Sequence, residues 1–343
     1  MTGIVEVARQ AGVSITTVSR VLSPKNDYPV APATRDRVVA AAAALQYSPS
    51  ALARALATRR SHIIGAVVSD IVDPYFAELV GGLEDIARPA GYLVIVCTTG
   101  RDPGIQRRYI ATLRDYRADG LILFGGEFVD DSGRRLLSRE LDRATRQGAV
   151  AVAVAGEHAD LPCIDVDQRT AAADMASYLV GLGHRRIGFI AGPQRVSTVR
   201  QRLGGFLDGM AAAGLHAAPE LVVESDFTYA GGKTASERLL RQSPTALFAA
   251  NDQMALGALA AARQAGVNVP AQLTVVGFGD TTPARQSAPA LTCVSMPRYR
   301  LGAAAMEAVL DALERGSTQV YPRRLPHHLV VRESSAAANS EGG

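Results

Sequence analysis

Cysteine is scarce in this chain: among 343 residues there are three, Cys97, Cys163 and Cys293. Their number is odd, their spacings are wide and no two of them form a Cys-x-x-Cys motif, so the pattern excludes a disulfide framework and a zinc site of the usual spacing. We interpret them as small buried hydrophobic residues in a reducing compartment. Neither a metal nor another cofactor is expected.

A long hydrophobic run is also lacking. The longest one, near Ala149 to Ala155, is much shorter than the roughly 20 apolar residues that cross a bilayer as a helix. The N-terminus begins directly with a helix-like pattern, without the charged and apolar stretches of an export leader. These absences favour a cytoplasmic protein that makes no contact with a membrane.

The short motifs of common catalytic sites are absent too. The sequence contains no G-x-x-x-x-G-K-[ST], no G-x-S-x-G and no H-E-x-x-H. The pair His327 and His328 is interpreted as a solvated turn. We therefore do not expect an enzyme, and a turnover assay on purified protein would test the enzyme alternative. All six histidines are scattered through the chain: His62, His158, His184, His216, His327 and His328.

Residues 5–22 are the most informative stretch that is present, because they predict two short helices joined by a tight turn. Val5, Val7 and Ala8 are expected to form an apolar stripe on the first helix, and Gly12 supplies the turn. This is the pattern of a helix-turn-helix, a DNA-reading motif. Any small helical hairpin shares the spacing, so the motif alone leaves that alternative open.

The second of these helices is expected from Ile15 to Leu22, with Ser14 as its N-cap. Val18, Val21 and Leu22 are expected to face inward. The outward face, which is available to a major groove, then consists of Ile15, Thr16, Ser19 and Arg20.

A third helix is predicted from Ala33 to Leu45, opened by Pro32, and would close a small core over the first two. The residues available for that core are Val38, Val39, Ala42 and Leu45. Residues 1–60 contain eight basic and three acidic side chains, a net charge of +5, whereas the whole chain carries +3. The positive charge therefore lies where a polyanion would bind.

A short helix is predicted after the headpiece, from Ser50 as its cap through Ala57. A helix of fewer than about 12 residues is marginal alone in water because its nucleation is costly. We therefore interpret residues 47–61 as a linker that folds only when something packs against it.

From Ser61 onward, short apolar strands alternate with amphipathic helices. Continuous runs of Val, Ile, Ala and Leu separated by helices predict parallel strands that are buried on both faces, arranged in two doubly wound α/β lobes. Ligands bind such lobes at the carboxyl ends of the strands, and two facing lobes form a cleft. The predicted strands are 63–69, 92–98, 120–125, 150–156, 186–192, 220–225, 246–251 and 273–279, with helices around 75–88 and 106–117.

Ten segments occur in a specific order and spacing: VARQAGVSITTVSRVL, TRDRVVAAAAALQYSPSALARAL, IIGAVVSDIVDPYFAELVGGLE, RADGLIL, GLGHRRIGFIAGP, RQRLGGF, FAANDQMALGALAAARQAGVNVP, VVGFGD, PALTCV and LVVRES. Together they resemble the LacI/GalR family of bacterial transcription regulators over residues 4 to about 334. The resemblance implies a homodimer whose headpieces read a pseudo-palindromic operator in double-stranded DNA. Its core would have a periplasmic-binding-protein-like fold and bind a small effector allosterically.

The resemblance implies an all-α headpiece, a hinge and a two-lobed core. No leucine heptad follows Ser334, so a dimer is expected rather than a tetramer. The predicted bounds are 1–48 for the helix-turn-helix headpiece, 49–60 for the hinge helix or linker and 61–343 for the effector-binding and dimerisation core, with an N-lobe of about 61–161 and 293–320 and a C-lobe of about 162–292 and 321–334.

Residue by residue, the resemblance implies that Ile15, Thr16 and Arg20 contact bases. Arginine has the fork geometry that matches guanine, and threonine can contact a base edge or a thymine methyl group. Leu56 matches a leucine inserted into the minor groove, on the same hinge segment as Ala53; its alternative role is to pack on the core. Phosphate contacts are implied for Ser14, Thr17, Ser19, Thr34 and Tyr47, although Thr17 and Ser19 could simply be solvated.

In the core, the resemblance implies an effector arginine at Arg202 and a ring-stacking aromatic at Phe227. The alternatives are an ion pair that braces a lobe for Arg202 and a core position for Phe76 and Phe227. Gly279 and Ala155 stand where many sugar-binding relatives have carboxylates, which weakens the case for a simple sugar. The predicted effector-binding residues are Ser69, Phe76, Phe124, Arg202, Phe227, Asn251 and Asp280.

The predicted function is therefore that of a DNA-binding transcriptional regulator, acting as a repressor, whose operator affinity responds to a sugar, a sugar derivative or a nucleoside-like effector. A free solute-binding protein is the binding-module alternative, but it would need an export leader and would lack residues 1–60. The sequence leaves open whether the effector induces or co-represses, and which genes are controlled.

Overall fold

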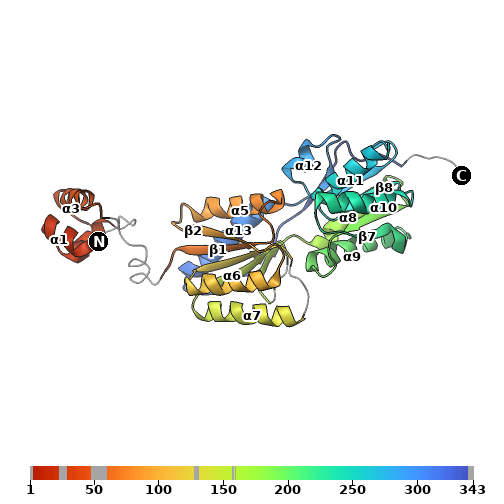
Figure 1. The fold of residues 1–343 in the computed structure, drawn as a ribbon. Coiled ribbons are helices and arrows are strands. Elements are labelled where there is room, and N and C mark those ends of the chain that lie inside the picture. Colours follow the sequence, from red (N-terminus) through yellow and green to blue (C-terminus); the bar gives the residue numbers. More distant parts are fainter. Residues whose placement is uncertain are drawn as a thin grey trace. The chain divides into compact units, whose positions relative to one another are not determined.

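The computed structural model describes residues 3–22, 29–47, 60–126, 131–156, 158 and 160–338. The chain divides into two compact units, Met1–His62 and Ile63–Gly343, which are considered separately (Figure 1). Among the described residues, no helix is both long enough and apolar enough to cross a membrane.

The first unit is a small helical headpiece. It contains α1 (Ile4–Ala11), α2 (Ile15–Val21) and α3 (Pro32–Ala44), as the sequence predicts. Gly12 ends α1 with a φ of 65°, a left-handed conformation that glycine adopts without strain. The buried core residues of the headpiece are Val7, Ala8, Ala11, Val18, Val21, Val38, Ala41 and Ala42.

Two predicted core positions of the headpiece are wrong. Val5 is 61% exposed and Val39 is 51% exposed. The reason is helical geometry: two residues along a helix correspond to a rotation of about 200°, so Val5 lies opposite Val7, and Val39 lies opposite Ala41. Ala41 takes the buried position in α3 instead.

The second unit begins with a lobe built on a six-stranded, all-parallel sheet of the order β11-β5-β4-β3-β1-β2. Alternate residues of β1 face opposite helical layers: Ile64 and Ala66 contact one core cluster, and Val67 contacts the other. The strands are β1 (Ile63–Val68), β2 (Leu93–Thr98), β3 (Gly120–Phe124), β4 (Val150–Val154), β5 (Cys163–Asp165) and β11 (Arg323–Arg324).

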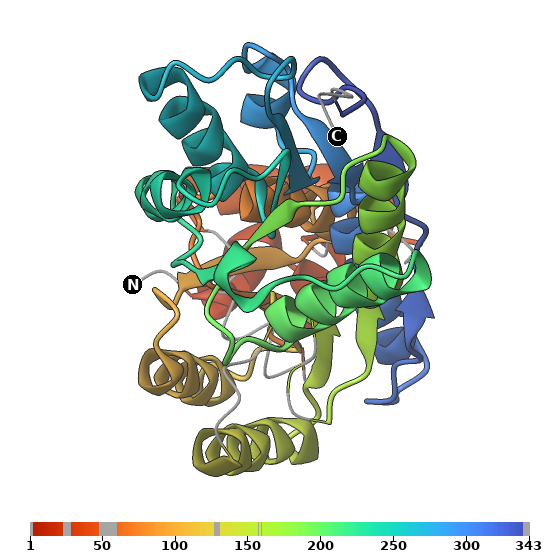
Figure 2. The same cartoon turned by 90° about the vertical axis from the view of Figure 1, so that its right-hand side faces the viewer.

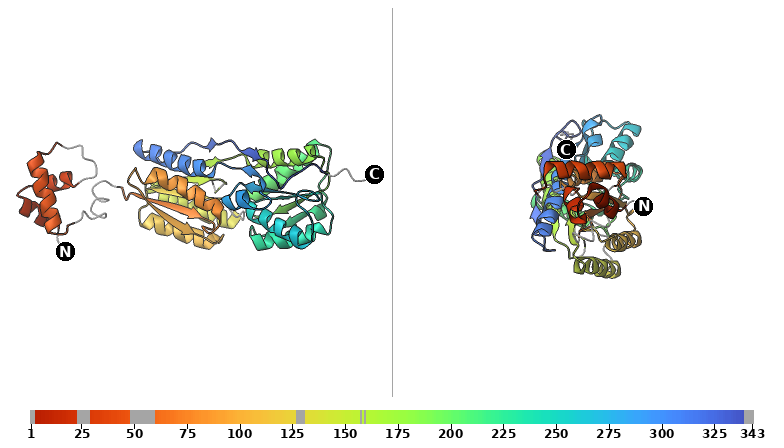
Figure 3. Two further views of the ribbon diagram at one scale, coloured as in Figure 1. Left: turned by 90° about the horizontal axis from the view of Figure 1, so that it is seen from above. Right: turned by 90° about the vertical axis from the view of Figure 1, so that its left-hand side faces the viewer.

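Helices cover both faces of this sheet. One layer consists of α6 (Pro103–Asp115) and α7 (Asp131–Arg146), and the other of α5 (Pro74–Ala87) and α13 (Arg298–Glu314), which lie side by side in Figure 3. The α5 and α13 backbones approach closely at two glycines. A Cβ at Gly82 would lie 2.0 Å from the Tyr299 carbonyl oxygen, and one at Gly302 would lie 1.8 Å from that of Leu79. Glycine is therefore required at both positions.

The second lobe has a six-stranded sheet of the order β12-β10-β9-β8-β6-β7, in which only the β10–β12 pair is antiparallel. Its helices form the pairs α8 with α9 and α10 with α11 (Figure 2). The strands are β6 (Ile187–Ala191), β7 (Val222–Glu224), β8 (Ala246–Ala249), β9 (Thr274–Gly279), β10 (Thr292–Ser295) and β12 (His328–Val330); the helices are α8 (Gln168–Gly181), α9 (Ser197–Ala212), η1 (Pro219–Leu221), α10 (Tyr229–Leu240), α11 (Asp252–Gln264) and α12 (Thr282–Gln286).

The sheet pairings place the crossings between the lobes a few residues from the predicted bounds. β5 pairs with β4 and β11 pairs with β5, so both strands belong to the first sheet, although their residues were assigned to the C-lobe. β10 pairs with β9 and belongs entirely to the second sheet. Strands of two or three residues have no detectable hydrophobic period, so the sequence pattern does not locate them.

A buried arginine, Arg298, joins the two lobes. The Nη2 of Arg298, in α13, donates to the carboxylate of Glu78 on α5 at 2.8 Å and to the carbonyl oxygen of Asp280, after β9, at 2.7 Å. One guanidinium therefore contacts a helix of the first lobe and a strand end of the second.

Candidate ligand-binding cleft and nucleic-acid interface

The two lobes of the second unit enclose a cleft of about 660 Å³, counted to its open mouth. The cleft lies at the carboxyl ends of the strands, where α/β folds bind ligands. The first lobe contributes Ser69, Asp73, Tyr75, Phe76 and Arg101, and the second contributes Thr198, Arg202, Phe227, Asn251, Asp252 and Phe278.

Arg202 occupies the interior of the cleft and is only 6% exposed. Its Nε donates to Gln168 Oε1 at 2.9 Å, its Nη1 donates to the Ala250 carbonyl oxygen at 2.5 Å, and its guanidinium stacks 3.9 Å from the Phe278 ring centroid. Burial is the main cause that lowers its pKa. Its Nη2 also donates to Met296 Sδ at 4.0 Å. The described hydrogen bonds of Arg202 thus go to an amide oxygen, a carbonyl oxygen and a sulfur, rather than to the carboxylate of a bracing ion pair.

A contact between an arginine and an aromatic ring connects the lobes across the cleft. The guanidinium of Arg101, from the first lobe, lies 5.2 Å from the ring centroid of Phe227, from the second. Both residues adopt left-handed φ values, 64° and 72°, which non-glycine residues adopt at a cost. Phe227 is held by Asn251, whose Nδ2 donates to its carbonyl oxygen at 2.9 Å. Its ring packs so close to Gly192 that a Cβ there would lie 2.3 Å away.

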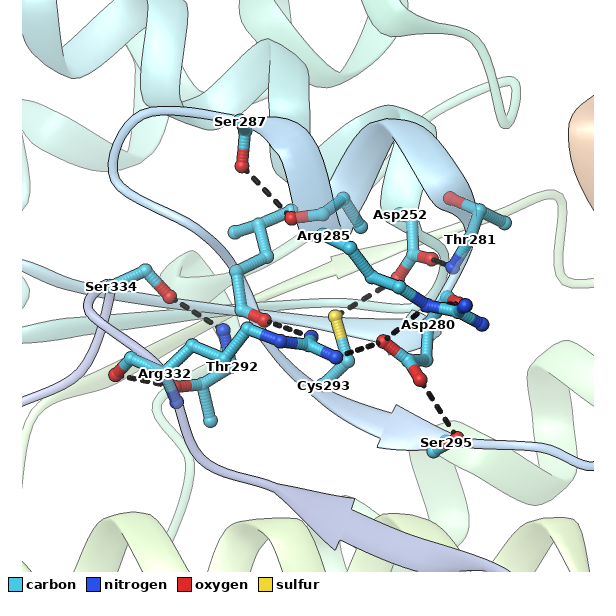
Figure 4. Close-up of polar contacts among 12 residues, drawn as sticks. Asp252, Asp280, Thr281, Arg285, Ser287, Thr292, Cys293, Ser295, Arg332 and Ser334 are labelled. Carbon is cyan, nitrogen blue, oxygen red and sulfur yellow. Dashed lines mark hydrogen bonds and ion pairs between the residues drawn. The ribbon is translucent and has the colours of Figure 1, made fainter.

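Two carboxylates line the cleft, and their partners differ. Asp73 caps α5, and its Oδ1 accepts a hydrogen bond from the Tyr75 amide at 3.0 Å. Asp252 accepts from the Thr281 amide at 2.6 Å and from the Cys293 thiol at 3.4 Å (Figure 4). Burial raises the pKa of both carboxyl groups. Since both oxygens of Asp252 are engaged, Asp73 is the better acceptor for a ligand.

Five of the predicted effector residues lie together in this cleft, and two do not. Phe124 is in the core of the first lobe. The carboxylate of Asp280 accepts hydrogen bonds from Arg332 at 2.6 Å and Ser295 at 2.9 Å, so it belongs to a polar network at the end of β9 (Figure 4). Residues lining the cleft are Ser69, Phe76, Arg202, Phe227 and Asn251.

Sequence reasoning missed Asp73, Tyr75, Arg101 and Phe278 on the cleft wall. For Asp73 a signal was present: an aspartate followed by a proline, just after a strand, is typical of a helix N-cap at a strand's carboxyl end. Arg101 had no local signal, because its ring partner is more than 100 residues away in the chain.

In the headpiece, the structure places the predicted base-reading residues on one exposed face of α2. Ile15 is 47% exposed, and Thr16, Ser19 and Arg20 are exposed as well. Ser14 caps the helix: its Oγ accepts from the Thr17 amide at 3.1 Å and lies 2.9 Å from Thr17 Oγ1. This exposed face presents an apolar side chain, hydroxyls and a guanidinium, which suits a DNA groove.

The remaining predicted DNA contacts are less uniform. Thr17 and Thr34 are half-buried, and Tyr47 packs partly against the headpiece core. Ala53 and Leu56 lie outside the described residues. Among the described residues, no group of His, Cys, Asp and Glu side chains is arranged to hold a metal ion.

His158 is expected to make the core sensitive to acid. It is 3% exposed, and burial lowers its pKa from 6.5 to about 4. The unfolded chain therefore binds a proton at a higher pH than the folded chain, so stability is lost as the pH falls from 6.5 towards 4, by up to about 3 kcal/mol. Denaturant titrations at pH 7 and pH 4.5 should show that His158→Gln loses less free energy of unfolding on acidification than the unmodified protein does.

Exposed His216 gives the matched control for this titration. Between pH 7 and pH 4.5, His216→Gln should lose as much free energy of unfolding as the unmodified protein. His184→Gln should lose somewhat less than the unmodified protein, since burial also lowers the pKa of His184. An equal acid loss in His158→Gln and His216→Gln would contradict the assignment.

Comparisons with known proteins agree with both units. Residues 3–50 match the profile described as bacterial regulatory proteins, lacI family, and residues 176–335 match a periplasmic binding protein-like domain. The HTH-type transcriptional repressor CytR of Escherichia coli strain K12 is 34% identical over 97% of this chain and 96% of its own. The HTH-type transcriptional repressor PurR of Proteus mirabilis is 37% identical over 98% and 97%.

Solved structures show the same likeness. A lac repressor dimer bound to operator and the anti-inducer ONPF superimposes with a TM-score of 0.86 at 28% identity, covering 98% of this chain and 99% of that one. A complex of the transcriptional regulator CelR with cellobiose has a TM-score of 0.72 at 31% identity and covers 97% and 100%. The likeness thus extends over the headpiece and both lobes.

Proposed function

The chain belongs to the lacI family of bacterial regulatory proteins, and from this premise we propose that it is a homodimeric transcriptional repressor whose operator binding responds to a small effector in the cleft. The observation that carries the proposal is the presence, in one chain, of an exposed polar face on α2 and a two-lobed ligand cleft. Binding of the purified protein to genomic fragments, with and without candidate effectors, tests it.

The effector class follows from the cleft wall. Tyr75, Phe76, Phe227 and Phe278 offer ring faces, and Asp73 offers a carboxylate acceptor. Arg101, Arg202 and Asn251 offer donors. The formal charges of the two arginines and two aspartates on the wall cancel. A neutral ring that bears several hydroxyl groups matches this wall, as a sugar or a nucleoside does.

A thermal-shift screen tests this effector class. The panel is D-ribose, D-glucose, cellobiose, adenosine and cytidine, and a specific binder at about 100 times its Kd stabilises the protein by roughly 2.7 kcal/mol. Calorimetry then gives the affinity. The proposed class fails if none of these compounds, at millimolar concentration, raises the melting temperature or releases heat.

The base-reading role of α2 is tested by exchanging its exposed residues. Ile15→Ala and Thr16→Ala are expected to change operator preference, because direct contacts to base edges discriminate by about 1–3 kcal/mol, while nonspecific affinity stays nearly constant. Ser19→Ala is the matched control, because Ser19 is predicted to contact a phosphate. It should lower DNA affinity slightly and equally for all sequences. Selection from a randomised duplex library gives the measurement. Equal losses on all sequences would mean that Ile15 and Thr16 support only the fold.

Residues 49–60 are proposed as a hinge that orders on the operator. Leucine insertion costs a few kcal/mol of unstacking, which the bent duplex returns as additional contacts. Leu56→Ala should therefore weaken operator binding by about tenfold or more without changing affinity for scrambled duplex, and Ala53→Pro should weaken it further by breaking the helix. Paired titrations with operator and scrambled duplex decide this. Intact operator preference in Leu56→Ala would leave the segment a passive tether.

The relatives are regulators rather than enzymes, and the lack of catalytic activity in this chain stays a prediction. A cytoplasmic location is likewise our proposal, supported by the DNA-binding role. The division into headpiece, hinge and core stays our proposal, and the two compact units Met1–His62 and Ile63–Gly343 support its first and last parts.

A further inference from the structure

Two loops, one from each lobe, meet on the solvent side of the ligand cleft. Arg101 lies between β2 and α6 of the first lobe, and Phe227 lies between β7 and α10 of the second. Both are half-buried, whereas Phe76, Arg202 and Asp252 on the same wall are buried. The guanidinium of Arg101 lies 5.2 Å from the ring centroid of Phe227, so this contact spans the cleft near its mouth.

The charge of Arg101 also acts on one carboxylate from each lobe. Burial raises the pKa of Asp226, beside Phe227, but hydrogen bonds from Thr228 and the charge of Arg101 lower it to below its ordinary value. In the first lobe, burial raises the pKa of Asp73, and the charge of Arg101 opposes that rise. Solvent screens the attraction to the exposed Asp226, so the ring contact is the main link between the two loops.

The backbone holds both partners of this contact in place. Arg101 has a φ of 64°, and its amide donates to Thr99 Oγ1 at 3.2 Å. Phe227 has a φ of 72°, and its carbonyl oxygen accepts from Asn251 Nδ2 at 2.9 Å. Strained residues of this kind persist where the surrounding structure fixes them, and they cluster at ligand clamps and switch regions. The contact is therefore built into both loops.

Arg298 provides a connection of a different kind between the lobes. It is 2% exposed, and its Nη2 donates to Glu78 in one lobe and to the Asp280 carbonyl oxygen in the other. Parting a buried charged group from its partners costs more than parting a half-exposed arginine from a ring. A cleft that opens to admit a ligand is therefore expected to part at Arg101 and Phe227, while the Arg298 contacts stay made.

We propose that Arg101 is a latch: by stacking on Phe227 it holds the second lobe against the first and slows the escape of a bound effector. Arg101 is a positioning residue in this role, since it acts on the effector through Phe227. The latch rests on the proposed function and adds to it the residue that sets how long the effector stays bound. An effector enters while the latch is open, so the latch affects dissociation far more than association.

The first test needs no effector. Hydrogen exchange of the full-length protein follows residues 225–232, where the amides of Thr228 and Gly231 donate to Asp226 Oδ1 and Thr228 Oγ1. Arg101→Ala should speed exchange of this segment about tenfold, because the loop loses the contact that holds it to the other lobe. Arg108→Ala, which removes an exposed arginine from α6, is the matched control and should change nothing. Unchanged exchange in Arg101→Ala would overturn the latch.

The second test measures the dissociation rate of whichever compound of the panel binds: D-ribose, D-glucose, cellobiose, adenosine or cytidine. Surface plasmon resonance should show that Arg101→Ala raises this rate about tenfold and changes the association rate by less than about threefold. Arg101→Lys keeps a cation that can contact the ring, so it should recover part of the slow dissociation. Arg108→Ala should dissociate as the unmodified protein does. An unchanged rate in a folded Arg101→Ala variant would speak against the latch.

A double-mutant cycle separates the latch from a direct contact between Arg101 and the effector. Phe227→Leu removes the ring on which the guanidinium stacks. In that background, Arg101→Ala should change the dissociation rate by less than about twofold, because the interaction that it removes is already gone. A tenfold rise in this background as well would mean that Arg101 contacts the effector itself, and the latch would be wrong.

The outcomes separate this proposal from the function on which it rests. If no compound of the panel binds the unmodified protein, the proposed effector class is wrong, and hydrogen exchange still decides whether Arg101 holds the lobes together. If a compound binds and Arg101→Ala alters neither the exchange nor the dissociation rate, the effector class stands and only the latch is wrong.

Discussion

Arg202→Ala is expected to weaken effector binding by about a hundredfold or more while the headpiece still binds DNA. The guanidinium is buried in the cleft, where hydrogen bonds from a charged donor contribute about 1.5–3 kcal/mol each. The substitution also leaves Gln168 Oε1 and the Ala250 carbonyl oxygen without their donor. A lower melting temperature should therefore accompany the loss of affinity. Calorimetry with the compound found in the screen measures the first effect, and denaturation measures the second.

Two further substitutions make this experiment specific. Arg200→Ala removes an exposed arginine from the same helix, α9, and should leave both affinity and stability nearly unchanged. Arg202→Lys keeps a positive charge but lacks the planar fork, so it should behave more like alanine than like arginine. Unchanged effector affinity in a folded Arg202→Ala protein would reduce Arg202 to a purely structural role.

Operator affinity is expected to fall at least a thousandfold between 50 and 200 mM salt. Residues 1–60 carry a net charge of +5 in each subunit, and α2 presents Arg20 on its exposed face. If a dimer neutralises about six to ten phosphates, the released counterions give this steep dependence. Titration of a labelled operator over a series of salt concentrations gives the slope of log K against log salt.

The salt experiment contains its own control. Effector affinity, measured by calorimetry at the same salt concentrations, should change little because the proposed effector is neutral and its site is partly enclosed. A slope near zero for the operator, or equal slopes for operator and effector, would contradict phosphate binding by the headpiece.

The sequence predicts the parts of this fold whose residues repeat with a clear period. β1, β3, β6 and β9 are continuous apolar runs because both faces of each sheet are buried. Ser14 and Gly12 likewise identify the bounds of α1 and α2. Short strands such as β5 and β11 have no such period, so their sheet was not predicted correctly.

The candidate site was predicted where a strand end and a family motif coincide, as at Ser69 and Asn251. The sequence did not predict site residues correctly where the direction of the side chain determines whether it lines the cleft. Asp280 follows β9, but its carboxylate is engaged by Arg332 and Ser295, whereas Asp73 lines the cleft without having been proposed. The direction of a side chain and its partners far away in the chain depend on tertiary packing, which a single sequence does not display.

The pairing of α5 with α13 has a consequence for how each chain is made. α13 begins at Arg298, whereas β4 of the same lobe ends at Val154, 144 residues earlier. At about 5–20 residues per second, a ribosome needs roughly 7–30 s to synthesise that interval. During this time Leu79 and Leu83 of α5 lack the helix that covers them in the finished protein. We therefore expect the nascent first lobe to be a chaperone substrate until α13 has emerged.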